Sequence, residues 1–88
     1  MDLEWDENKR ESNLEKHGLD FVDAARVLQG DLLELDDDCH DEPRVLAFGF
    51  LGSTVVLVVY SMRKETYRII SMRKAEPNEE RTYFEALF

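Results

Sequence analysis

The chain has 88 residues, which is the size of one domain and excludes a second independent active domain. Cys39 is its only cysteine, so no intrachain disulfide can form, and the N-terminus has no signal-peptide pattern. The longest apolar runs are far shorter than the roughly 20 residues that span a bilayer. We therefore expect a single soluble, cytoplasmic domain over residues 1–88, without membrane contact.

The net charge of −9 is unevenly distributed along the chain. Residues 61–74 contain five basic residues and one acidic residue, a net charge of +4, so the rest of the chain carries −13. The acidic residues are concentrated between Asp31 and Glu42. A negative protein repels nucleic acid at long range and favours basic partners, whereas the basic segment favours an anionic ligand. Either segment is also consistent with a merely solvated face.

The first part of the chain has the pattern of one short strand and two helices. Residues 3–5 are expected to form the strand, and Asp6 is a suitable N-cap for a helix that ends at His17, with Gly18 as its left-handed stop. Only Leu14 is strongly apolar in this helix, which predicts weak anchoring unless its polar surface has another use. Asp20 is expected to cap a second helix with one apolar face, formed by Phe21, Ala24, Ala25 and Leu28.

The second part of the chain has the pattern of a β-meander and a final helix. We expect an edge strand over residues 31–35, strands over 44–51 and 54–61 joined by Gly52-Ser53, and a last strand over 66–72. The apolar run 55–60 predicts a central strand that is buried on both faces. Pro77 suits the first position of a C-terminal helix. The expected fold is α+β: a four- to five-stranded, mainly antiparallel sheet with two N-terminal helices and one C-terminal helix.

Three groups of residues resemble the BrnT toxin family, whose fold is related to that of the RelE-like ribonucleases. Their order and spacing carry the resemblance over nearly the whole chain. The groups are Glu4-Trp5-Asp6 with Lys9, Asn13 and Lys16-His17-Gly18-Leu19; Phe21 with Ala24-Ala25; and Arg68-Ile69-Ile70-Ser71-Met72-Arg73 with Ala75, Glu79 and Tyr83. The resemblance implies a RelE-like fold and an endoribonuclease toxin of a type II toxin–antitoxin system. It also implies a BrnA-like antitoxin as partner. The toxin would contact DNA only indirectly, through this antitoxin.

Metal-independent RNA cleavage needs a base for the 2′-hydroxyl proton, cations for the phosphoryl oxygens and an acid for the leaving 5′-oxygen. Arg63 and Arg73 lie at the two ends of the last hairpin, and their guanidinium groups match phosphate oxygens, so we expect both to be catalytic. Arg44 and Arg68 are further candidates for substrate binding. Strand alternation places Arg68 and Arg73 on opposite faces unless a bulge intervenes. Each arginine is equally consistent with a surface cation paired with a carboxylate.

His17 is a candidate proton-transfer residue, because imidazole exchanges protons near neutral pH. A structural role is also open, since a histidine beside Gly18 in the last helical turn is favoured by the helix dipole. Asn13, Lys16 and His17 share one helical face, which would give the polar helix a use, with Lys16 contacting phosphate. Trp5, Tyr67 and Tyr83 could stack on bases, although aromatic residues in so small a domain are more often core.

No cofactor or metal is expected. Cys39 and His40 are adjacent, but no second such pair exists, and structural zinc sites need four ligands. Asp36, Asp37 and Asp38 are expected to bind the antitoxin. The alternative function is a catalytically inactive protein-binding module that acts only through this partner.

Overall fold

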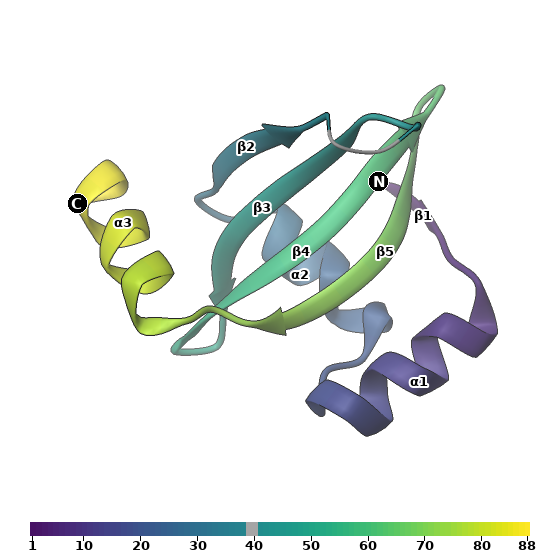
Figure 1. The fold of residues 1–88 in the computed structure, drawn as a ribbon, viewed down its shortest axis with the longest axis horizontal. Helices are drawn as coiled ribbons and strands as arrows, with labels where there is room; N and C mark the ends of the chain where they lie inside the picture. The colour runs from purple at the N-terminus through teal and green to yellow at the C-terminus, as the bar shows by residue number, and fades with distance from the viewer. Residues whose placement is uncertain (39–40) are drawn as a thin grey trace.

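The computed structural model describes residues 1–38 and 41–88 and confirms the α+β class (Figure 1). The elements are β1 (Asp2–Glu4), α1 (Glu7–His17), the short 3-10 helix η1 (Phe21–Asp23), α2 (Ala24–Leu28), β2 (Leu33–Asp37), β3 (Arg44–Leu51), β4 (Thr54–Arg63), β5 (Thr66–Lys74) and α3 (Pro77–Leu87). Cys39 and His40, the residues weighed as metal ligands, lie outside the described residues. No helix in the described part of the chain is long and apolar enough to cross a membrane.

All five strands form one sheet in the order β1-β5-β4-β3-β2. The strands from β2 to β5 are antiparallel to their neighbours, as the meander pattern predicted, and β1 joins β5 in parallel. β4 is the central strand, and the side chains of residues 55–58 are buried. Alternation along β4 sends them to both faces of the sheet, which confirms the prediction from the continuous apolar run.

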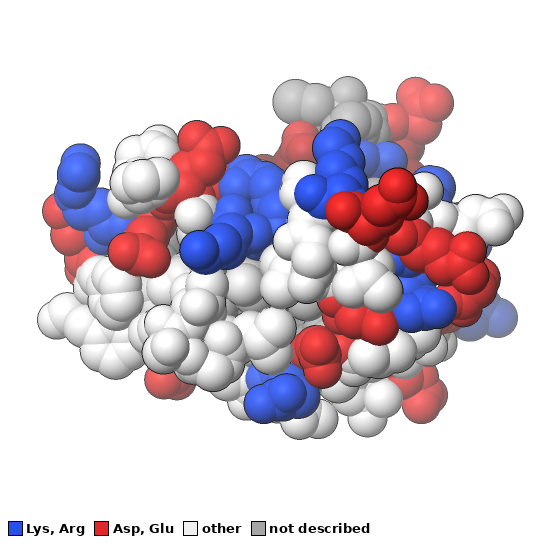
Figure 2. Space-filling view, turned by 90° about the horizontal axis from the view of Figure 1, so that it is seen from below, with Lys and Arg blue, Asp and Glu red and all other residues white. Residues whose placement is uncertain are grey.

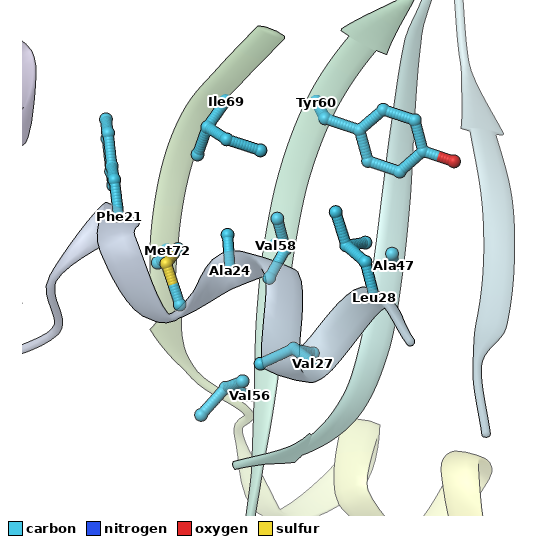
Figure 3. Packing of buried hydrophobic residues seen from close by; sticks show 10 residues of the cluster. All are labelled: Phe21, Ala24, Val27, Leu28, Ala47, Val56, Val58, Tyr60, Ile69 and Met72. Atoms are coloured by element: carbon cyan, nitrogen blue, oxygen red, sulfur yellow. The ribbon is translucent and has the colours of Figure 1, made fainter. Parts of the chain in front are cut away.

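A helix covers part of each face of the sheet. α2 packs across one face and forms the main core with β3, β4 and β5 (Figure 3). α3 covers one end of the other face, where buried Tyr83 packs with Phe48, Val55 and Leu57. We call these the α2 face and the α3 face. Over the rest of the α3 face, toward the β4–β5 turn, no helix of the described residues lies (Figure 1).

The predicted helix boundaries follow from capping. The Asp6 carboxylate accepts hydrogen bonds from the backbone N–H groups of Asn8 and Lys9, at 2.9 and 3.4 Å. Gly18 adopts the left-handed conformation, with φ of 70°, that a helix stop requires. At α3, Pro77 is in the first turn, and Glu76 and Glu79 form a reciprocal capping box.

Several elements differ from the predicted boundaries: β1 begins and ends one residue earlier, and β4 and β5 each continue two residues farther. Asp20 caps η1 rather than a continuous helix, and α2 begins only at Ala24. β2 begins two residues later than predicted, because the Asp31 carbonyl accepts a hydrogen bond of 2.8 Å from the buried Tyr83 hydroxyl instead of entering the sheet. This contact ties the start of β2 to α3, and the register with β3 places Leu33 and Leu35 on the face that this helix covers.

Candidate active site

α1 is attached to the sheet through Asn13 rather than through an apolar stripe. Its one strongly apolar residue, Leu14, is 40% exposed, whereas Asn13 is buried. The Asn13 amide nitrogen donates to the Leu19 and Met72 carbonyls at 3.1 and 2.9 Å, and its oxygen accepts from the Met72 N–H at 3.2 Å. β1 pairs with β5 only at residues 66–68, so the Asn13 side chain takes the place of a neighbouring strand farther along β5.

A hollow of about 220 Å³ lies between α1 and the outer edge of β5. α1 contributes Lys16 and His17, the two candidates that were named on this helix, and β5 contributes Ile70 and Ser71. The other lining residues are Lys9, Ser12 and Asn13. The shared helical face predicted for Asn13, Lys16 and His17 is therefore present, and it faces β5. An anion in this hollow would lie beside two lysines, an imidazole and two hydroxyl groups.

A β-bulge decides which arginines share a face of β5. Ile69 pairs with Tyr60 and Ser71 pairs with Val59, so Ile70 is the extra residue. Simple alternation would have placed Arg68 and Arg73 on opposite faces. Beyond the bulge the alternation is shifted by one residue. The side chains of Arg68, Ser71 and Arg73 then point to the same face as those of their β4 partners, and this is the α3 face. The partners are Ser61, Val59 and Leu57. Both arginines therefore belong to the α3 face, with Ser71 and the hollow between them.

The arginines lie along the sheet rather than around one point. Arg63 and Leu57, the β4 partner of Arg73, are six positions apart, which corresponds to about 20 Å. The two arginines expected to be catalytic, Arg63 and Arg73, therefore begin far apart along the strand direction. Arg44 is the first residue of β3 and lies beside Ser61 of β4, which pairs with Arg68 on its other side. Arg44 therefore belongs to the end of the sheet near Arg63. The Arg44 Nε atom is buried and has no hydrogen-bond partner among the described residues.

Arg73 is held by the start of α3. Its guanidinium donates two hydrogen bonds to the Glu79 carboxylate at 2.8 and 2.9 Å, and a third to the Lys74 carbonyl at 3.2 Å. The hydrogen bond from Arg73 is the main cause that lowers the pKa of Glu79, and the same pair raises the pKa of Arg73. The two-point geometry fixes the guanidinium plane at the α3 face while its side chain stays 32% exposed.

The arginines near the β4–β5 turn also have acidic neighbours. Arg68 lies 3.6 Å from the Glu4 carboxylate, and Arg63 lies 3.5 Å from that of Glu42. The nearby Ser61 hydroxyl and then Arg63 lower the pKa of the Glu42 carboxylate. The Ser61 hydroxyl is buried and has no partner at full hydrogen-bond geometry among the described residues. Acidic and basic side chains are also interspersed on the face shown in Figure 2, where neither sign covers a large area alone.

The three aspartates expected to bind the antitoxin occupy different positions. Asp36 and Asp37 are the last residues of β2, and Asp38 follows the strand. The register places Asp37 opposite Arg44 and Asp36 opposite Val45, so their side chains point to opposite faces of the sheet. They lie at the sheet edge opposite the α1 hollow.

Sequence reasoning missed several features of the site. Ser12 was not named, although it lies on the same helical face as Lys16, four positions away. The structural role of Asn13 had one signal in the sequence, which is an asparagine in the middle of a helix that has almost no apolar residues to anchor it. Tyr83 proves to be core and is fully buried. Among the described residues, no group of three or more His, Cys, Asp or Glu side chains is arranged to hold a metal ion.

Comparison with known families identifies the chain. The profile described as "Ribonuclease toxin, BrnT, of type II toxin-antitoxin system" matches residues 5–79, which include α1, the whole meander and the start of α3. The chain belongs to the BrnT family. No curated protein matches it. The BrnT assignment makes the chain a toxin of the ribonuclease type and implies an antitoxin protein as its partner.

Proposed function

We propose that this BrnT chain is an active, metal-independent endoribonuclease that cleaves RNA through the 2′-hydroxyl and is neutralised in the cytoplasm by a BrnA-like antitoxin. The observation that carries the proposal is the bulge at Ile70. It aligns Arg68, Ser71 and Arg73 on one face, next to the hollow that contains Lys16 and His17. A row of basic groups along a strand matches the successive phosphates of a single-stranded nucleic acid better than it matches one isolated anion.

The chemistry assigns a role to each group. The 2′-oxygen attacks the adjacent phosphorus, the bond from phosphorus to the 5′-oxygen breaks, and the products are a 2′,3′-cyclic phosphate and a free 5′-hydroxyl. His17 would transfer a proton, either from the attacking hydroxyl or to the leaving oxygen. Lys16 and Arg73 would stabilise the negative charge on the phosphoryl oxygens, and Arg68 would bind a neighbouring phosphate. Arg63 and Arg44 would contact RNA farther along the sheet.

A second candidate function is supported by the ion pairs. Arg63, Arg68 and Arg73 each lie within 4.0 Å of a carboxylate, so RNA phosphates must compete with Glu42, Glu4 and Glu79. A protein that had lost catalysis would retain such pairs as structural contacts and would act only through its antitoxin. The two functions differ in one result, which is RNA cleavage by the chain alone.

The test is cleavage of a labelled RNA by purified toxin freed of antitoxin. We expect Lys16→Ala and His17→Gln to lower the cleavage rate at least tenfold. A positioned proton-transfer group contributes about 100-fold or more, and a group that stabilises the charge of the transition state contributes about as much. Arg26→Ala removes an exposed cation on α2, away from the hollow, and should leave the rate unchanged. Full activity of His17→Gln would assign His17 to helix capping. Absence of cleavage by the folded wild-type chain, with normal growth of cells that express it, would support the inactive module.

A further inference from the structure

Within the described residues, β2 is an edge strand with one unpaired side. It pairs with β3 along one side, and no described element lies beyond its other side (Figure 1). Such an edge presents backbone N–H and C=O groups that can pair with a strand from another chain. Proteins often protect an exposed edge with proline or with charged side chains, above all lysine. β2, Leu-Glu-Leu-Asp-Asp, contains neither lysine nor proline, and its charges are all acidic, so they oppose an acidic strand and not a basic one.

An apolar hollow of about 190 Å³ lies beside β2 on the α3 face. Its sheet wall is formed by Leu33, Leu35, Leu46 and Phe48, and its helix wall by Asn78, Glu79 and Thr82. Leu35 is 47% exposed. A cavity of about 150 Å³ accommodates benzene, so this hollow has room for one large apolar side chain. A strand paired along β2 would direct alternate side chains toward the hollow.

The opposite face of the same edge is acidic. Glu34 and Asp36 point to the α2 face, where Glu34 accepts a hydrogen bond from the Tyr60 hydroxyl. Residues 27–43 contain no lysine or arginine. An added strand would therefore have one row of side chains against leucines and the other row against carboxylates. A second copy of β2 does not fit this edge, because like charges directly opposite each other in a sheet are destabilising.

We propose that β2 docks a strand of the partner protein that alternates apolar and basic residues. Its apolar side chains enter the hollow beside α3, and its lysine or arginine side chains face Glu34 and Asp36. The inference rests on the proposed antitoxin partnership, because the antitoxin is the partner that would supply this strand. The docking edge is at the opposite side of the sheet from the α1 hollow, so occupation of β2 alone leaves Lys16 and His17 uncovered.

The experiment uses the full chain and, as the probe, a BrnA-like antitoxin. Complex formation should slow hydrogen exchange of the backbone amides in Leu33–Asp37 and leave those of β1 unchanged. Leu35→Asp should weaken binding about tenfold or more, because it places a charge in the apolar hollow. Asp36→Lys should weaken binding about fivefold by opposing the basic residues of the strand.

Matched controls use the same changes elsewhere. Val22→Asp alters an exposed apolar residue on η1, and Glu11→Lys reverses an exposed charge on α1; both should bind within about twofold of the wild type. Unchanged exchange in β2 within a formed complex, or wild-type affinity of Leu35→Asp, would overturn the docking proposal and leave the partnership standing. Failure of the folded wild-type chain to bind the antitoxin would instead overturn the partnership.

Discussion

Replacement of Asn13 by alanine should detach α1 from β5. The side chain makes three hydrogen bonds, two of them to the backbone of Met72, and it is buried. At a net value of about 0.5–1.5 kcal/mol for each hydrogen bond, the loss is about 1.5–4.5 kcal/mol. An 88-residue domain has a total stability of about 4–13 kcal/mol, so the change removes a large part of the free energy of unfolding.

Urea unfolding, followed by the fluorescence of Trp5, measures this loss. Asn8→Ala is the matched control, because Asn8 is exposed on the same helix and alanine has the higher helix propensity. The control should be neutral or slightly stabilising. A free energy of unfolding for Asn13→Ala within about 0.5 kcal/mol of the control would show that the three hydrogen bonds do not anchor α1.

Three further predictions concern Glu79, Gly18 and the acidic residues 36–38. Because Arg73 lowers the pKa of Glu79 in the folded chain, the pair stabilises the fold above the ordinary carboxyl pKa of 4.5 and loses this effect as pH falls through the lowered value. Urea unfolding at several pH values should therefore show a smaller loss of stability on the acid side for Glu79→Gln than for the wild type. Gly18→Ala should cost about 1 kcal/mol in the same assay, because φ is 70° and nothing lies within 4 Å of the added Cβ, whereas Gly30→Ala should be nearly neutral. Replacing residues 36–38 by asparagine should slow antitoxin association at low salt and reduce its salt dependence, measured by stopped flow, while RNA cleavage by free toxin stays unchanged.

The fold could be predicted well because its signals are local. The Asp6 cap, the Gly18 stop and the Gly52-Ser53 turn each act within a few residues, and all three are present. The run from Val55 to Tyr60 specified a central strand because only such a strand is buried on both faces. The start of β2 was misplaced because the Tyr83 hydroxyl, from the other end of the chain, determines it.

The arrangement of the site could be predicted only in part. The helical spacing of Lys16 and His17 was sufficient to place them on one face, but their position over β5 depends on the hydrogen bonds of Asn13. The faces of Arg68 and Arg73 depend on the bulge at Ile70, which shifts the alternation by one residue. No local pattern marks this bulge, because it arises from pairing with β4.

The most direct test of the proposed activity is cleavage of one labelled RNA in EDTA, compared with the same oligonucleotide carrying a single 2′-deoxy substitution at the cleaved position. Attack by the 2′-oxygen predicts cleavage of the all-RNA strand to a 2′,3′-cyclic phosphate and no cleavage of the substituted strand at that position. Cleavage of both strands at equal rates, or loss of all cleavage in EDTA, would contradict the account.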